Sequence, residues 1–174
     1  VDIVNLIDRL DDLTTVETYD PYRVLVVEDQ APIANYYKMV LTMASMDAQV
    51  ITEPTKVIQQ MIEFHPDLVL MDLYMPDVGG AELVRVIRQM DEFVSIPIVF
   101  LSSEDDFNKQ MEAMSLGGDD FLTKPIKASH LVAVVKSRLE RLKTLRSYMV
   151  RDSLTGLLNH TSLRSTLIQE VNRC

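Results

Sequence analysis

Leu68-Val69-Leu70-Met71-Asp72-Leu73-Tyr74-Met75-Pro76 is an apolar run that ends in a carboxylate and passes at once into a turn. Four consecutive apolar residues without polar alternation are typical of a strand buried on both faces, as in a parallel sheet. Because a charge is costly inside such a strand, we expect Asp72 at its carboxyl end, where open α/β sheets bind ligands. Aspartate is also a favoured helix N-cap, so this residue alone leaves a structural and a functional interpretation open.

The composition indicates a globular protein with an uneven distribution of charge. The 174 residues are 47% hydrophobic and 25% charged, and no apolar run approaches the ~20 residues of a membrane span. A single cysteine, Cys174, and the lack of a visible signal peptide favour a cytoplasmic protein. The net charge is −15 over residues 1–126 and +6 over residues 127–151. The acidic body argues against nucleic acid as a partner, although the basic segment alone leaves that class open.

Strand-like runs and helix-like spacings alternate five times between residues 23 and 150. We expect strands at 23–27, 50–51, 68–72, 96–101 and 119–123. The expected helices cover 33–41, 57–64, 83–90, 111–116 and a long stretch from about 129. This alternation predicts an α/β fold, a doubly wound five-stranded parallel sheet with helices on both faces and an extended C-terminal helix.

Chemically active side chains follow the predicted ends of four strands. They are Glu28 and Asp29, Asp72, Ser102 and Lys124. In a parallel sheet all of them meet at one edge. Clustered carboxylates repel one another and need a cation, and hard oxygen ligands suit Mg²⁺. Lys124 and Ser102 supply a charge and a hydroxyl for phosphoryl oxygens, so the set indicates phosphoryl transfer to an aspartate.

Residues 23–143 resemble the CheY-like receiver domains of two-component response regulators. The resemblance is carried by the order of the motifs at the strand ends and by the loop after Asp72. The matching residues are Glu28, Asp29, Asp72, Gly80, Ser102, Phe121, Lys124 and Pro125. It implies that Asp72 accepts a phosphoryl group from a sensor histidine kinase or phosphotransfer protein, with Lys124 and Ser102 as its catalytic partners. Ser102 and Phe121 would then be the switch residues.

The resemblance also implies a cofactor. It assigns Mg²⁺ to Glu28, Asp29, Asp72 and the backbone carbonyl of Tyr74. Three positions depart from the family pattern: Ser103 replaces a smaller residue, Phe121 lacks the hydroxyl of the commoner tyrosine, and Tyr74 is bulky beside the acceptor. None of them removes a required group. A phosphate-independent pseudo-receiver, which only docks partners, is the alternative.

The last helix predicts the output. Its apolar spacing is close to a heptad seam, so residues 129–151 are expected to continue the receiver as a coiled-coil stalk that pairs in a homodimer. The following Asp152-Ser153-Leu154-Thr155-Gly156-Leu157-Leu158-Asn159 resembles the opening segment of diguanylate cyclase (GGDEF-type) domains, with His160 at a place that is commonly arginine. Residues 152–174 are thus expected to be the truncated start of such a domain, with GTP binding only in its missing part. A transcription factor is a further alternative, but no helix-turn-helix pattern follows.

Two shorter segments complete the prediction. Gly117-Gly118-Asp119-Asp120 is superficially similar to the cyclase signature, but its place before Phe121 assigns it to the fifth strand without nucleotide chemistry. Residues 1–20 are interpreted as a short amphipathic helix and a linker ahead of the receiver core, 21–128. That helix either docks on a partner or packs on its own domain. Its apolar stripe is formed by Ile3, Leu6, Ile7, Leu10 and Leu13.

Overall fold

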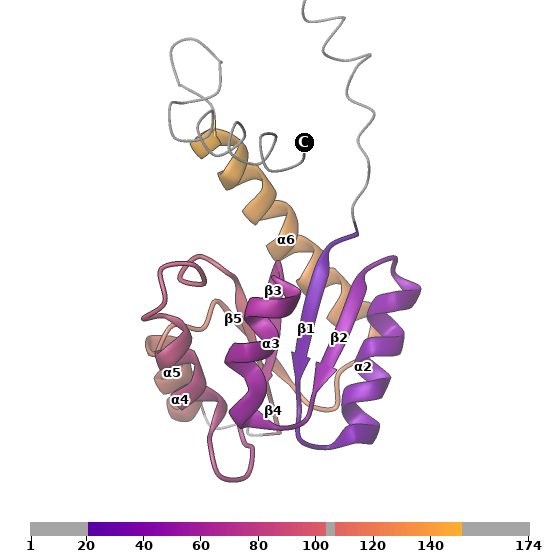
Figure 1. The fold of residues 1–174 in the computed structure, drawn as a ribbon. Helices are drawn as coiled ribbons and strands as arrows, with labels where there is room; N and C mark the ends of the chain where they lie inside the picture. The colour runs from indigo at the N-terminus through magenta and orange to yellow at the C-terminus, as the bar shows by residue number, and fades with distance from the viewer. Residues whose placement is uncertain (1–20, 104–106, 151–174) are drawn as a thin grey trace, which may run out of the picture.

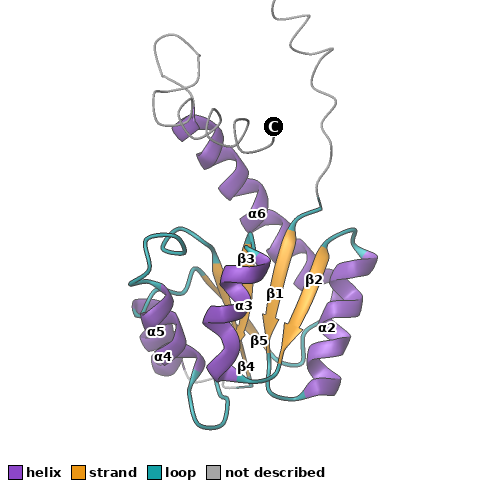
Figure 2. Cartoon of the chain, viewed as in Figure 1, coloured by secondary structure: helices purple, strands orange, loops and turns teal. Residues whose placement is uncertain are grey.

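The computed structural model describes residues 21–103 and 107–150. They form a five-stranded parallel sheet with strand order β2-β1-β3-β4-β5, covered by helices on both faces (Figures 1 and 2). This confirms the predicted α/β class and topology. The expected helix within residues 1–13 and the cyclase-like segment 152–174 lie outside the described residues. Within the described ranges, no helix is both long and apolar enough to cross a membrane.

The elements follow one another in regular β-α alternation, and each crossover returns to a parallel strand. The strands are β1 (Arg23–Val27), β2 (Asp47–Ile51), β3 (Leu68–Asp72), β4 (Ile98–Ser102) and β5 (Asp120–Thr123). The helices are α2 (Ala31–Met43), α3 (Val57–Phe64), α4 (Gly80–Ile87), α5 (Phe107–Ser115) and α6 (Ala128–Val150), with a short 3₁₀ turn η1 (Pro54–Lys56).

Two strand starts differ from the sequence prediction by two residues or more. β2 begins at Asp47 rather than at residue 50, because the edge strand pairs with β1 from Arg23 onward; its first residues alternate in burial and so lack a continuous apolar run. β4 begins at Ile98 rather than at residue 96. Pro97 has no N–H for the ladder and contributes only its carbonyl, which accepts a bond from Val69 N.

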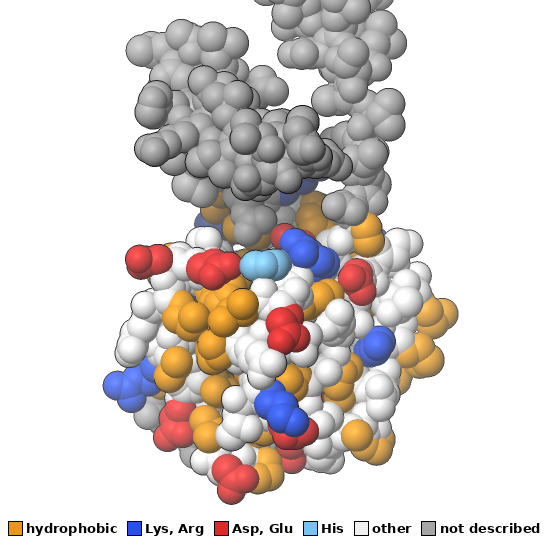
Figure 3. All heavy atoms as spheres, in the orientation of Figure 1, with side chains coloured by type: hydrophobic (Ala, Val, Ile, Leu, Met, Phe, Trp, Pro, Cys, Tyr) orange, Lys and Arg blue, Asp and Glu red, His pale blue; other side chains and the backbone are white. Residues whose placement is uncertain are grey.

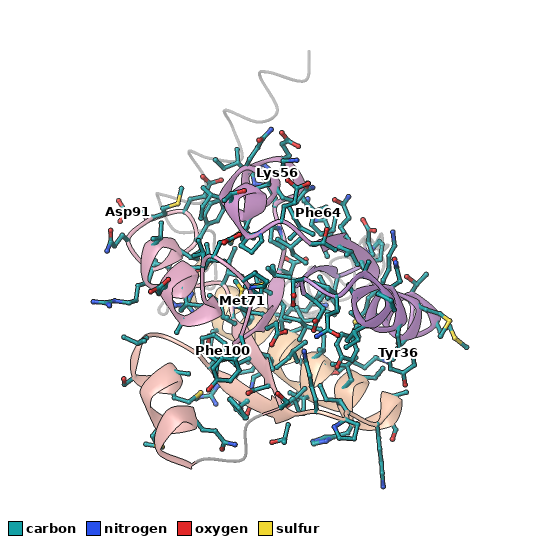
Figure 4. The ribbon with its side chains drawn as sticks, turned by 90° about the horizontal axis from the view of Figure 1, so that it is seen from below. Tyr36, Lys56, Phe64, Met71, Asp91 and Phe100 are labelled. Carbon is teal, nitrogen blue, oxygen red and sulfur yellow. The ribbon has the colours of Figure 1, made fainter. Side chains whose placement is uncertain are left out.

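Two hydrophobic layers enclose the sheet, because alternate residues of the central strands point to opposite faces. Val69, Met71 and Phe100 belong to the layer under α3, α4 and α5, whereas Leu70 and Leu101 face α2 and α6. Met71 and Phe100 are partners on neighbouring strands and lie near the centre of the view from below (Figure 4). This two-sided burial holds the carboxyl ends of the strands at one rigid edge.

The helices also present some hydrophobic side chains to the outside. Figure 3 shows such side chains on the face over α3 and α4. Ile62 of α3 and Val86 of α4 are each about half exposed. Single exposed apolar residues are ordinary on protein surfaces, so we assign this face no role.

Candidate phosphoryl-acceptor site

Strand register brings the predicted site residues together. Met71 pairs with Val27, so the next residues, Asp72 and Glu28, end neighbouring strands. On the other side, Asp72 pairs with Leu101, which places Ser102 one residue further along β4. Ser102 in turn pairs with Thr123, and its carbonyl accepts a bond of 2.7 Å from the backbone N–H of Lys124. The carboxyl edge therefore collects these groups from four separate segments.

Lys124 connects two buried carboxylates at the centre of the site. Its Nζ donates to Glu28 Oε2 at 2.6 Å and to Asp72 Oδ2 at 2.9 Å. Glu28 is fully buried and Asp72 is 3% exposed. Buried charges are tolerated only when they are paired and hydrogen-bonded, and this amine serves both carboxylates at once.

The charges in the site do not balance. Burial raises the pKa of Glu28 and outweighs the lowering effect of the hydrogen bond from Lys124, and the nearby Asp72 carboxylate raises that pKa further. Burial alone would lower the pKa of Lys124, but its hydrogen bonds to Glu28 and Asp72 and the charges of these two carboxylates together outweigh burial and raise that pKa. Lys124 thus stays protonated at neutral pH, while Asp29 adds a third carboxylate beside the pair. The site has room for another positive charge.

The carboxylates fit a hard divalent cation. Oxygens of Glu28, Asp29 and Asp72 all lie within 4.8 Å of one another. One of them, Asp29 Oδ1, is buried without a hydrogen-bond partner among the described residues. A buried oxygen that no donor satisfies is costly, and a cation with oxygen ligands would satisfy it. These residues are therefore suited to Mg²⁺.

The loop after β3 holds the acceptor in place. The backbone N–H of Tyr74 donates to Asp72 Oδ1 at 3.3 Å, and the Tyr74 side chain is 47% exposed. Gly80 packs directly on Asp72: a Cβ at this position would overlap the Asp72 carbonyl oxygen. The backbone N–H of Gly80 also bonds to the Leu73 carbonyl, at 3.1 Å. The loop thus clamps the backbone next to the acceptor.

The two switch residues named from the sequence lie in different surroundings. Ser102 is fully buried at the end of β4, directly beside the acceptor strand. Phe121 lies on the edge strand β5, where it pairs with Phe100 of β4, and it is partly buried against the core. Lys124 follows three residues later at the end of that strand, so a change at the carboxylates would reach Phe121 through the backbone of β4 or β5.

Sequence reasoning missed one neighbour of the site. Tyr37 of α2 is buried, and its pKa is raised by burial and by the Glu28 and Asp72 charges, against the opposing effect of Lys124. Its spacing on the helix marks it only as a core position. No local sequence signal separates such a residue from other core residues, because its proximity to the carboxylates arises from helix packing.

Comparison with known proteins identifies the family to which this fold belongs. The response regulator receiver domain family matches residues 24–136. The chain belongs to this family. It is a receiver domain of a two-component response regulator, as the order of motifs predicted.

Relatives of this receiver domain are parts of longer proteins. The chain is 41% identical over 125 residues to an uncharacterized 76.5 kDa protein of Thiocystis violacea, covering 72% of this chain and 18% of that protein. It is 37% identical over 119 residues to the DNA-binding response regulator MtrA of Mycobacterium tuberculosis, covering 68% of this chain and 51% of MtrA. The receiver domain thus spans about half or less of these relatives.

Solved receiver domains have the same fold. One is the receiver domain of the Francisella response regulator 1452, with 26% identity and a TM-score of 0.64 over 69% of this chain and 98% of that one. Another is the BeF3-activated N-terminal receiver domain of RstA from Klebsiella pneumoniae, with 26% identity and a TM-score of 0.63 over 67% of this chain and 97% of that one.

Proposed function

We propose that this receiver domain takes a phosphoryl group onto Asp72 from a sensor histidine kinase or phosphotransfer protein in the cytoplasm. The observation that carries the proposal is the junction of Lys124 with Asp72 and Glu28 at the carboxyl edge of the sheet. Asp72 is the phospho-acceptor, and Lys124 and Ser102 are its catalytic partners. Mg²⁺ would be held by Glu28, Asp29, Asp72 and the backbone carbonyl of Tyr74, where it would offset phosphoryl charge.

The transfer is a displacement at phosphorus. A carboxylate oxygen of Asp72 attacks the phosphoryl group of the donor phosphohistidine; the new O–P bond forms as the P–N bond breaks, and the imidazole leaves with the electron pair. The product is an acyl phosphate. Lys124 exchanges its contact with the Asp72 carboxylate for one with the incoming phosphoryl oxygens, and the Ser102 hydroxyl donates a hydrogen bond to one of them.

The same step supplies the switch. As Ser102 moves toward the phosphoryl group, space opens along β4 and Phe121 rotates inward. Phe121 lies on β5, and the same strand carries Asp120, which accepts hydrogen bonds from the Arg138 side chain of α6 at 2.7 and 3.0 Å. We infer that this contact passes the change from the receiver core, 21–128, to the stalk, 129–151, which pairs in a homodimer.

The proposed output is a diguanylate cyclase that begins at residues 152–174. Its support is the Asp152-Ser153-Leu154-Thr155-Gly156-Leu157 segment, which follows directly on the helical stalk. GTP would bind only in the remainder of that domain, and nucleic acid would not be a partner. A DNA-binding output is the second candidate, because MtrA carries that name. Production of cyclic-di-GMP by the full-length protein distinguishes the two, since a DNA-binding output would make none.

The Asp72→Asn variant tests the acceptor. We expect uptake of phosphate from radiolabelled acetyl phosphate with Mg²⁺ in the unmodified chain and none in the variant, because an amide is not a nucleophile for this transfer. Asp77→Asn, in the loop five residues further on, is the matched control and should keep full labelling. Labelling retained in Asp72→Asn would refute the acceptor assignment.

A pseudo-receiver would behave differently in two respects. It would bind Mg²⁺ weakly and give no change in its amide NMR spectrum on addition of beryllofluoride, whereas a phospho-accepting receiver responds around Asp72, Ser102 and Lys124. The intact set of buried, paired groups favours the phospho-accepting function.

A further inference from the structure

One side of α2 exposes three large apolar side chains to solvent. Tyr36, Met39 and Met43 are 41%, 53% and 80% exposed. Their spacing of three and four residues places them on one side of the helix, away from the side on which Tyr37 and Leu41 are buried. We name Tyr36, Met39 and Met43 the α2 stripe. Because α2 already packs on the sheet with its other side, the stripe is a second apolar surface rather than a single exposed residue.

The α2 stripe is suited to an apolar partner. The Tyr36 ring contacts the Tyr37 ring, with centroids 5.7 Å apart and planes at 55°, so a buried neighbour supports it. Met39 and Met43 have unbranched side chains, which adapt to the shape of whatever covers them. The stripe therefore combines one supported ring with two adaptable side chains.

The α2 stripe is too small for a stable contact between two chains. Such an interface uses roughly 20 residues a side, whereas the stripe has three. A segment of the same chain needs less buried area, because a short linker gives it a high effective concentration. A tethered segment is therefore a better occupant than a second copy.

The chain enters the sheet beside the most exposed end of the stripe. The backbone N–H of Asp47 donates to the Tyr22 carbonyl at 2.9 Å, and Asp47 follows Met43 by four residues, at most about 14 Å. Figure 1 shows that α2 ends at the same edge of the sheet at which β1 begins. The nine residues from Leu13 to Tyr22 can span about 30 Å, and α2 is only about 20 Å long. Residues 1–13 can therefore reach the whole stripe.

The sequence of residues 1–13 matches the stripe in spacing. Ile3, Leu6 and Leu10 repeat the steps of three and four residues that separate Tyr36, Met39 and Met43. Two turns of helix on each side would therefore meet along the same length of about 10 Å.

The charge of residues 1–13 also favours α2 over the other helices. With four aspartates and one arginine, this segment has a net charge of −3. Lys38 is the only charged residue of α2, whereas each of the other described helices carries a glutamate. On an acidic body, an acidic segment is repelled least at a helix without acidic side chains.

We propose that residues 1–13 dock as an amphipathic helix on the α2 stripe of the same chain. Leu6 and Leu10 cover Met39 and Met43, and the aspartates stay in solvent on the other side of the docked helix. The docking requires neither phosphorylation of Asp72 nor a second copy.

A paramagnetic label beside the α2 stripe tests the proposal. The full chain with Thr42→Cys and Cys174→Ser carries a nitroxide at residue 42, an exposed position next to Met43. This chain is labelled with ¹⁵N and diluted into an excess of unlabelled, unmodified chain. We expect the amide signals of residues 3–13 to lose most of their intensity. The same label at Val86→Cys, on α4 across the sheet, should leave them unchanged.

Substitutions in the stripe give the second arm. Met39→Glu and Met43→Glu together should restore the signals of residues 3–13, because they remove the apolar surface and repel the aspartates. Ile62→Glu is the matched control, since Ile62 is 47% exposed on α3, and it should leave the loss of signal as it was. Unchanged signals of the sheet residues would show that the core stays folded.

Three results would overturn the proposal. The first is a set of signals from residues 3–13 that stays strong beside the label at residue 42. The second is a loss of signal that survives Met39→Glu with Met43→Glu, since tethering alone would then bring the segment near α2. The third is a loss seen only when the nitroxide and the ¹⁵N are on different chains, since a second copy would then be the occupant. None of them bears on labelling of Asp72.

Discussion

Single residues in this receiver domain carry an electrostatic cost that serves the site. Glu28, Asp29 and Asp72 lie within 4.8 Å of one another with only the Lys124 amine hydrogen-bonded between two of them. Burial raises the pKa of Glu28 despite that amine, which means that the folded state holds a proton on Glu28 more tightly than the unfolded chain does. The arrangement is unfavourable without a cation and favourable with one, as expected for a site kept for function rather than for stability.

Removing the Glu28 charge should therefore stabilise the cation-free protein as pH rises. A carboxyl whose folded-state pKa is raised contributes stability that is fully present below its unfolded value of 4.5 and is lost as pH rises through the folded pKa. We expect the difference in unfolding free energy, Glu28→Gln minus unmodified, to grow in favour of the variant from pH 4.5 towards pH 8. Urea denaturation in EDTA measures it.

A matched control separates this effect from general surface charge. Glu63→Gln, on the exposed side of α3, should show no such trend. Adding Mg²⁺ should reverse the order at pH 8, because the cation binds the unmodified site more tightly and ligand binding stabilises the folded state. A variant whose advantage stays constant across the pH range would contradict the proposed role of Glu28.

At the scale of elements, arginines join helices to the strands that they cover. Arg138 pairs α6 with Asp120 at the start of β5. Arg88, which caps the end of α4, donates to the carbonyls of Phe93, Val94, Ile96 and Gly117 and to the Asp119 carboxylate. Its side chain is only 18% exposed. One side chain therefore organises the amino-terminal edge of β4 and β5, opposite the phosphoryl site.

Truncating this arginine should be costly. Arg88→Ala removes the side-chain donor to several carbonyls and leaves the Asp119 carboxylate with its bond from the Ile98 backbone N–H. We expect a loss of about 3 kcal/mol in the free energy of unfolding, as for the removal of several hydrogen bonds from one charged donor. Arg85→Ala, one turn earlier and exposed, should change it by less than about 0.5 kcal/mol. Equal effects of the two variants in urea denaturation would show that the Arg88 contacts contribute little.

At the scale of the whole molecule, the question is whether phosphorylation changes assembly. The body is acidic and α6 is basic, so like surfaces of two copies repel each other and a pair along α6 must be held by its apolar positions. We expect light scattering to show a higher mass with Mg²⁺ and beryllofluoride than without, and no change in Asp72→Asn. A dimer in every condition would mean that phosphorylation only reorients an existing pair. A monomer in every condition would place the pairing surface outside this chain or favour a pseudo-receiver.

The sequence by itself determined the chemistry and the class of fold. Continuous apolar runs predict buried parallel strands, and a polar side chain after such a run is confined to the strand end, so Glu28, Asp72, Ser102 and Lys124 are placed at one edge by local pattern alone. Gly80 and the family motif follow from the same local information. Because each of these signals lies within a few residues of its own strand end, no knowledge of packing is needed to find it.

Only the tertiary structure decided which of these groups touch. The bonds of Lys124 to Glu28 and Asp72 join residues 96 and 52 positions apart, and they depend on strand register. Tyr37, Arg88 and Arg138 gain their roles from helix packing, which no spacing in the chain encodes. The early start of β2 also follows from pairing with β1, because an edge strand needs backbone partners more than an apolar run. Contacts between distant segments depend on how whole layers pack, and that is why the sequence pattern alone leaves them open.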